Sequence, residues 1–172
     1  MHSEINTLKD LKNSGYVSLD IKDEMIKNLK NNLSDGVSTF EGIYGYDDSV
    51  IPDLERAILS KHNINLLGLR GQAKTRLARQ LTNLLDEWIP IVKGSEINDD
   101  PFNPISHFAK NKILELGDAT PIDWVSRNDR FFEKLATPDV TVAVLIGDID
   151  PIKAATLKLS YSDPSVIHFG MI

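Results

Sequence analysis

A glycine-containing run with a lysine and a threonine is the part of this sequence with the clearest chemistry. Residues 68–75 read Gly-Leu-Arg-Gly-Gln-Ala-Lys-Thr. They fit the phosphate-binding pattern GxxxxGK(S/T), except that Ala73 stands at the second glycine. In that pattern backbone N–H groups converge on a phosphate, the lysine reaches the β- and γ-phosphates, and the hydroxyl ligates Mg²⁺. The sequence therefore predicts a nucleotide site in which Lys74 contacts the phosphates and Thr75 ligates Mg²⁺.

The residues around this loop bear on the choice between a phosphate site and a plain glycine turn ahead of a basic helix. Residues 64–67, Ile-Asn-Leu-Leu, predict a buried strand before the loop, and residues 74–85 have the apolar spacing of a helix. No acidic residue lies between Glu55 and Asp86, whereas six lysines and arginines do. The methyl group of Ala73 is a steric cost at a point of close approach. The context favours the phosphate loop, and the glycine turn stays open as the alternative.

The composition bounds the class of protein. The chain has 172 residues, no cysteine and a formal net charge of −6. Without cysteine it forms neither a disulfide framework nor a thiolate metal site. It has no apolar run of about 18 residues, and its N-terminus lacks the basic and apolar regions of a secretory signal. We expect a cytoplasmic protein with no membrane partner. An acidic chain with one local basic window favours a small anionic ligand over nucleic acid.

Apolar spacing and turn residues predict alternating helices and strands, which is the α/β fold class. Val140–Ile146 is rich in β-branched residues and gives the strongest predicted strand. Pro151 suits the first turn of a short helix over 151–157. The other predicted helices are 5–14, 18–31, 47–60, 106–116 and 126–135, the other strands are 88–92 and 166–169, and 33–42 and 94–104 are loops.

The run Asn65–Arg79 closely resembles AAA+ ATPases of the magnesium-chelatase subunit I and MoxR-like group. Those proteins often have a GxxGxAKT form of the loop, so alanine at the second glycine position is a habit of the subgroup. Ile43–Asp48 is similar to the segment that these ATPases place against adenine. Leu145–Ala154 resembles a hairpin inserted before their Walker B strand, and Val166–Ile172 resembles the run-in to that strand. The likeness covers roughly residues 40–172.

The resemblance implies a P-loop NTPase fold, with a three-layer α/β/α core preceded by N-terminal helices. Residues 1–36 would be the helical segment and 37–172 the N-terminal portion of an AAA+ nucleotide-binding domain. ATP and Mg²⁺ are the implied cofactors, with ATP or ADP as ligand. Lys74 and Thr75 would be catalytic, and Thr75 would ligate Mg²⁺. The implied nucleotide-binding residues are Tyr44, Gly45, Tyr46, Gly68, Leu69, Arg70, Gly71, Gln72, Ala73, Lys74, Thr75 and Arg76.

The same resemblance implies partners and an activity. Complete modules of this group hydrolyse ATP, assemble into homo-oligomeric rings and remodel partner proteins. The chelatase relatives insert metal together with a von Willebrand-type partner protein. This chain stops before the Walker B strand, so by itself we expect it to bind nucleotide and to hydrolyse it negligibly. A second hypothesis is a non-catalytic interaction module that keeps a P-loop shape without the catalytic half.

Acidic residues outside the loop leave further alternatives open. Val140–Ile146 followed by Asp148 and Asp150 has the shape of a Walker B strand, in which Asp148 would help to hold Mg²⁺. Alternatively, both aspartates are turn residues before a helix that starts with proline. A metal-binding loop and plain solvated carboxylates are both open for three more acidic residues, Glu96, Asp99 and Asp100.

Overall fold

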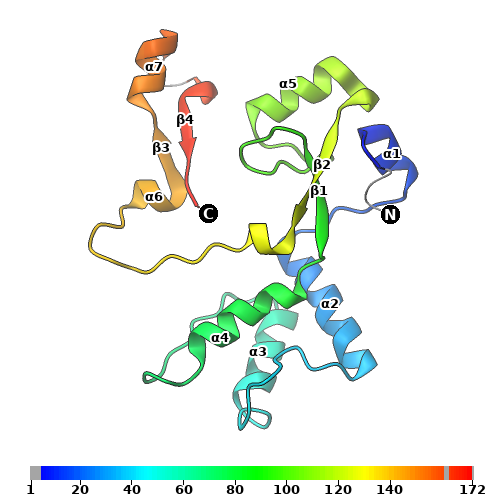
Figure 1. Cartoon of the computed structure of the whole chain (residues 1–172), viewed down its shortest axis with the longest axis vertical. Helices are drawn as coiled ribbons and strands as arrows, with labels where there is room; N and C mark the ends of the chain where they lie inside the picture. The colour runs from blue at the N-terminus through cyan, green and yellow to red at the C-terminus, as the bar shows by residue number, and fades with distance from the viewer. Residues whose placement is uncertain (1–4, 161–162, 172) are drawn as a thin grey trace. The chain divides into compact units, whose positions relative to one another are not determined.

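The computed structural model describes residues 5–160 and 163–171, and the chain divides into two compact units (Figure 1). We call Val17–Ile89 with Ser126–Asn128 the helical unit. Met1–Tyr16, Pro90–Val125 and Asp129–Ile172 make up the hairpin unit. The described residues form seven α-helices and four strands in two small sheets, so the fold is mixed α/β. None of the helices in these residues is both long and apolar enough to cross a membrane.

α2 (Ile21–Asp35) shows how local sequence sets a helix of the helical unit. Asp20 caps it by accepting two backbone N–H groups of the first turn, at 2.8 Å each. Gly36 ends the helix in the left-handed conformation, with a φ of 68°. The predicted helix over 18–31 is therefore confirmed, and it continues into the start of the predicted loop.

α3 (Val50–Leu59) and α4 (Lys74–Gln80) pack with α2 around an apolar core. Pro52 lies in the first turn of α3, where its missing N–H costs nothing, and α4 continues as a 3₁₀ turn over Leu81–Leu84. The predicted helices over 47–60 and 74–85 are thus confirmed. Buried side chains form two clusters, Phe40, Ile43, Leu54 and Leu77 in one, and Leu29, Ile58 and Leu84 in the other.

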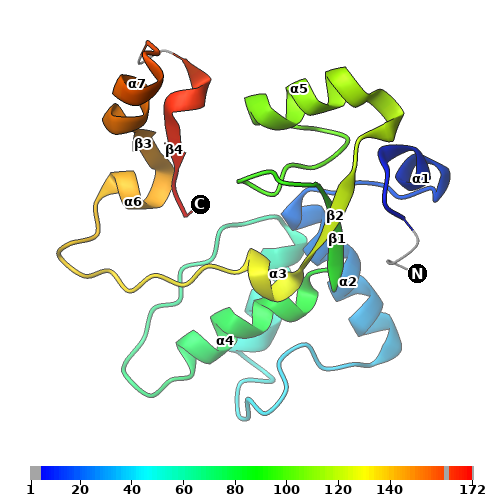
Figure 2. The ribbon, with the colours of Figure 1, turned by 45° about the horizontal axis from the view of Figure 1, so that its top comes forward.

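The chain between α3 and α4 differs from its prediction. Residues 64–67 belong to no strand and form part of a loop that leads into α4 (Figure 2). Ile64 and Leu66 pack against the core, whereas Leu67 is 85% exposed. A strand needs a neighbour to take its backbone hydrogen bonds, and none of the described strands pairs with these residues. The predicted strand is wrong, although the apolar side chains that suggested it are partly buried.

β1 (Trp88–Val92) pairs with β2 (Ile122–Ser126), a strand that the sequence did not predict. Two flanking backbone hydrogen bonds show the antiparallel direction, Lys93 N–H to Pro121 O and Arg127 N–H to Glu87 O. The helix predicted over 126–135 is wrong. Ser126 belongs to β2, and within the predicted range a 3₁₀ turn forms over Arg127–Arg130.

Side-chain caps position the remaining helices of the hairpin unit. α1 (Leu8–Asn13) begins with a capping box in which Thr7 and Asp10 bond each other's backbone N–H. α5 (His107–Leu116) begins at Ser106, whose hydroxyl accepts the backbone N–H of Ala109 at 3.0 Å. The helices predicted over 5–14 and 106–116 are confirmed.

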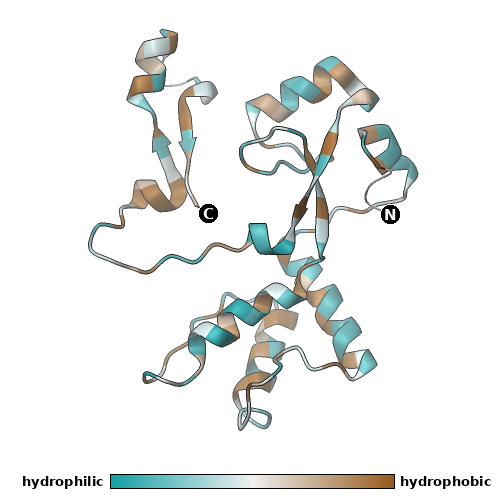
Figure 3. Ribbon diagram, viewed as in Figure 1, coloured by the Kyte–Doolittle hydropathy of each residue, from teal (hydrophilic) through white to brown (hydrophobic). Residues whose placement is uncertain are grey.

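The chain after residue 140 contains the second sheet. β3 (Gly147–Ile149) and β4 (Ile167–Phe169) pair antiparallel, with α7 (Pro151–Leu157) between them in sequence. α6 (Val142–Ile146) is a helix where the strongest strand was predicted, and Figure 3 shows it as a hydrophobic segment. Pairing begins only at Gly147, so the β-branched residues before it have no partner strand and that prediction is wrong. The helix and strand predicted over 151–157 and 166–169 are confirmed.

Candidate phosphate-binding loop

The loop of residues 68–75 turns back on itself at Gly71 and Ala73, whose φ angles lie in the left-handed region. Gly71 has a φ of 80°, and Ala73, directly before α4, has a φ of 53°. Glycine adopts such a conformation freely, whereas an L-residue there costs roughly 1 kcal/mol. Ala73 therefore keeps the left-handed conformation that glycine would adopt without strain.

Two side chains occupy the hollow of this loop. The Oε1 atom of Gln72 accepts the backbone N–H of Leu69 at 2.8 Å. The Nζ atom of Lys74 donates to the carbonyl oxygen of Gly68 at 2.8 Å and also to that of Leu69. A Cβ atom on Gly68 would lie 2.2 Å from Gln72 Oε1, so glycine is what allows this close approach. Side chains of the loop therefore satisfy one of its backbone N–H groups and two of its carbonyl oxygens.

A pocket of about 270 Å³ adjoins the loop within the helical unit. Its lining residues are Tyr46, Val50, Asn65, Leu66, Leu67, Gln72, Lys74 and Leu77. The hydroxyl of Tyr46 also donates a long hydrogen bond, 3.5 Å, to the carbonyl oxygen of Gln72. The structure therefore brings one of the predicted adenine-segment residues, Tyr46, to the loop, and the pocket combines an aromatic and aliphatic wall with the ammonium of Lys74.

The segment that carries Tyr46 is tied to α4 through the carbonyl oxygen of Glu41. Arg76 donates to this oxygen at 3.3 Å and Gln80 at 2.7 Å. The two side chains are four residues apart, on one face of the helix, so both reach the same carbonyl. Gly42 has a φ of 67°, and a Cβ atom there would lie 2.5 Å from Arg76 Nη2. Arg76, predicted to bind nucleotide, instead holds the neighbouring segment in this structure.

Other predicted residues of the nucleotide site lie on the surface of the helical unit. Tyr44 is 87% exposed and does not line the pocket. Gly45 and Arg70 are exposed as well. Thr75 is exposed in the first turn of α4, directly after Lys74, where its hydroxyl can offer one oxygen ligand. Of the predicted set, Tyr46, Gln72 and Lys74 line the pocket.

Asp148 and Asp150 belong to the hairpin unit and have different surroundings. Asp150 caps α7 by accepting the backbone N–H groups of Ile152 and Lys153, at 2.9 Å each. Asp148 is exposed on β3. Because the residues before them form α6, the Walker B alternative loses the strand on which it depended. Asp150 has the capping role of a residue before a helix that starts with proline.

Asp99 is a buried carboxylate that sequence reasoning treated as a loop residue. It is 3% exposed, and it accepts hydrogen bonds from four donors. These are Ser95 Oγ at 2.6 Å, Ile105 N–H at 2.6 Å, Ser106 N–H at 2.9 Å and Ser106 Oγ. Burial raises the pKa of Asp99, but the hydrogen bonds from Ser106, Ser95 and the backbone outweigh it and hold the pKa below its ordinary value of 3.8.

Asp99 and Asp100 of the acidic loop accept hydrogen bonds from donors of the loop itself. Both oxygens of Asp99 are engaged by the loop's own donors, and Asp100 accepts the backbone N–H of Phe102. In the part of the chain that the structure describes, no group of three or more histidines and carboxylates is placed to hold a metal ion. No local spacing signals this arrangement, because the donors at Ile105 and Ser106 lie six and seven residues after Asp99, beyond the range of an Asx turn.

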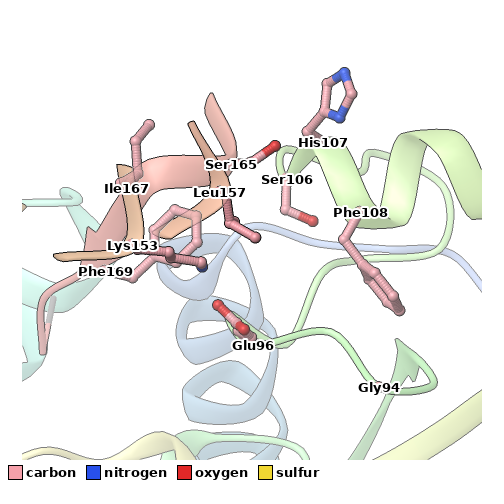
Figure 4. A pocket seen from close by; sticks show the side chains of 10 residues that line it. All are labelled: Gly94, Glu96, Ser106, His107, Phe108, Lys153, Leu157, Ser165, Ile167 and Phe169. Carbon is pink, nitrogen blue, oxygen red and sulfur yellow. The ribbon is translucent and has the colours of Figure 1, made fainter. Parts of the chain in front are cut away.

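A second pocket, of about 370 Å³, lies in the hairpin unit (Figure 4). Its lining comes from the start of α5 with the loop before it, and from α7, β4 and the segment between them. Figure 4 shows Glu96, His107 and Lys153 as the ionisable side chains of this lining. None of the residues predicted for the nucleotide site contributes to it, whereas Glu96 of the acidic loop does.

Comparisons with protein-family models, with curated proteins and with solved structures give no match for this chain. The functional conclusion therefore depends on the loop motif, the pocket beside it and the resemblance found in the sequence.

Proposed function

We propose that this chain binds ATP or ADP with Mg²⁺ through the loop of residues 68–75. The observation that carries the proposal is the pocket in which Tyr46 and Lys74 line the same space. An aromatic and aliphatic wall suits a planar base, and a few polar groups at one end of an apolar pocket fix the orientation of a ligand. The ammonium of Lys74 supplies the charge that a phosphate chain requires.

Two residues of the loop, Lys74 and Thr75, fit the phosphates and the metal ion of a magnesium nucleotide. Mg²⁺ takes oxygen ligands in an octahedral arrangement and usually keeps several waters, with substrate phosphates as further ligands. Thr75 would contribute one hydroxyl oxygen to that set. Bound Mg²⁺ would offset negative charge on the β- and γ-phosphates, while Lys74 would leave the carbonyl oxygens of Gly68 and Leu69 to contact the same phosphates.

The resemblance to AAA+ ATPases supports a wider proposal. The chain would be the N-terminal portion of a magnesium-chelatase or MoxR-like module with a three-layer α/β/α P-loop core. Such a module hydrolyses ATP, forms a homo-oligomeric ring and remodels or assists metal insertion into a partner, with a von Willebrand-type protein as one possible companion. Residues 43–79 carry this part of the proposal, since the loop motif and the adenine-facing segment both lie there.

Calorimetric titration with Mg-ATP and Mg-ADP tests the proposal. Removing the ammonium in Lys74→Ala should weaken binding roughly 10- to 100-fold, since a hydrogen bond to a charged group contributes about 1.5–3 kcal/mol. Lys30→Ala is the matched control, because Lys30 is an exposed lysine of α2 in the same unit. It should bind like the wild type. Absence of binding by the wild type, or equal affinity in both variants, would contradict the proposal.

Exposed leucines at the start of the loop favour a second candidate function, the interaction module. Leu67 is 85% and Leu69 77% exposed, on either side of Gly68. Apolar side chains gathered on a surface mark sites of protein contact. If neither nucleotide binds, this candidate predicts that a Leu67→Ser, Leu69→Ser double variant loses a concentration-dependent association that the wild type shows in sedimentation experiments.

A further inference from the structure

We infer that the side-chain amide of Gln72 is an internal stand-in for a phosphate oxygen, which a bound polyphosphate has to displace. The inference rests on the proposed function, since it concerns the same loop, and it assigns Gln72 a role in setting affinity. Gln72 is a positioning residue in this sense, because it acts on the ligand through the backbone N–H of Leu69.

The geometry of the loop carries the first step. A phosphate-binding loop contacts its ligand through backbone N–H groups and a lysine ammonium. In this chain the N–H of Leu69 is already donated to Gln72 Oε1 at 2.8 Å. Lys74 Nζ donates hydrogen bonds to the carbonyl oxygens of Gly68 and Leu69. Acceptors of the chain itself therefore occupy donors that a phosphate would use.

Backbone conformation explains why the amide reaches this position. Positive φ angles at Gly71 and Ala73, on either side of Gln72, fold the loop so that its side chain points back to Leu69. Gly68 has no Cβ, and a Cβ there would lie 2.2 Å from the amide oxygen. The contact between Gln72 and Leu69 therefore depends on the positive φ angles of Gly71 and Ala73 and on the missing side chain of Gly68.

The strength of the contact indicates that it can be exchanged. Gln72 is exposed and makes one neutral hydrogen bond to the loop, which contributes about 1 kcal/mol at most sites. A phosphate oxygen carries a charge, and a charge-assisted hydrogen bond is roughly twice as strong as a neutral one. A phosphate therefore replaces the amide, but its apparent affinity is reduced by the bond that has to be broken first.

Three substitutions separate this role from a direct contact with ligand. Gln72→Ala removes the amide, and Gln72→Asn shortens it by one methylene so that the contact with Leu69 is lost. Both should bind Mg-ATP and inorganic triphosphate more tightly, by about two- to tenfold. Gln72→Glu keeps an acceptor at the same distance and adds a negative charge, so it should bind both ligands more weakly than the wild type.

The experiment is calorimetric titration of the full chain and its three variants with Mg-ATP and with inorganic triphosphate. Tighter binding by the alanine and asparagine variants, together with weaker binding by the glutamate variant, supports the inference. Retained binding with equal or weaker affinity in the alanine variant overturns it and leaves the proposed function standing. No binding of either ligand by any of the four proteins overturns both.

Discussion

Two loops of this molecule place a side-chain acceptor against backbone N–H groups, and the two acceptors differ in how deeply they are buried. In the hairpin unit the carboxylate of Asp99 is 3% exposed and receives four hydrogen bonds within residues 95–106. In the helical unit the amide of Gln72 is exposed and receives one, from Leu69. Both loops lead into a helix, α5 in the first case and α4 in the second.

The difference shows what separates a structural loop from a ligand loop. A buried, charged acceptor with four donors cannot leave without exposing or orphaning all of them, so the loop around Asp99 has one stable arrangement. An exposed, neutral acceptor with one donor can be replaced by water or by a ligand at little cost. The sequence predicted a phosphate loop over residues 68–75 and left the role of Asp99 open, but it did not show how deeply either acceptor is buried.

Removing the carboxylate should produce the largest effect. Asp99→Ala would leave buried N–H and hydroxyl donors without an acceptor and should lower the free energy of unfolding by about 3 kcal/mol or more. Glu96→Ala, at an exposed carboxylate of the same loop, should change it by less than about 0.5 kcal/mol. Urea denaturation measures both. Similar small losses in the two variants would mean that Asp99 does not organise the loop.

Titrating the same carboxylate should have a smaller effect with a defined sign. The pKa of Asp99 in the folded protein lies below 3.8, so at acid pH the unfolded chain binds more protons. Its contribution to stability is complete above about pH 4 and is lost as the pH falls through the folded-state pKa. Asp99→Asn should therefore show a shallower decline of stability between about pH 5 and 2 than the wild type. Parallel pH profiles in urea unfolding would exclude the effect.

Ala73 offers the smallest and most local comparison. Its φ of 53° strains an L-residue, so Ala73→Gly should raise the free energy of unfolding by about 0.5–1 kcal/mol. Ala78→Gly, inside α4, should have the opposite sign and lower it by about 1 kcal/mol. Thermal unfolding of the two variants gives the comparison. The same direction of change in both would show that Ala73 is not strained.

Most of the helices were predictable because their signals are local, whereas the helix predicted over 126–135 did not form and α6 was not predicted. Asp20, Pro52 and Ser106 act within one turn of the helix that they begin, and the structure confirms each helix. The strands over 64–67 and 140–146 were predicted from apolar and β-branched residues alone, but a strand also requires a neighbour, which composition does not reveal. β2 was missed for the same reason, since its residues gain their conformation by pairing with β1.

The candidate site was predictable in its chemistry and not in its present arrangement. The motif singled out Lys74 and Thr75, and the expected adenine segment contributes Tyr46 to the pocket. The contacts of Arg76 with Glu41 and of Gln72 with Leu69 depend on the folded path of the chain. No sequence pattern reveals that path. The burial of Asp99 depends in the same way on the fold of its loop.

The chain that approaches the loop has a thermodynamic consequence for any ligand. The downstream end of the loop is anchored by α4, whose Leu77 is buried. Residues 62–67 belong to no strand and are held by the partial burial of Ile64 and Leu66 and by a hydrogen bond from Lys22 to Asn63. Immobilising a residue costs about 1–2 kcal/mol of backbone entropy. A nucleotide that orders residues 62–67 should bind with a favourable enthalpy and an opposing entropy. A strand pairing with residues 62–67 would then raise nucleotide affinity without touching the nucleotide.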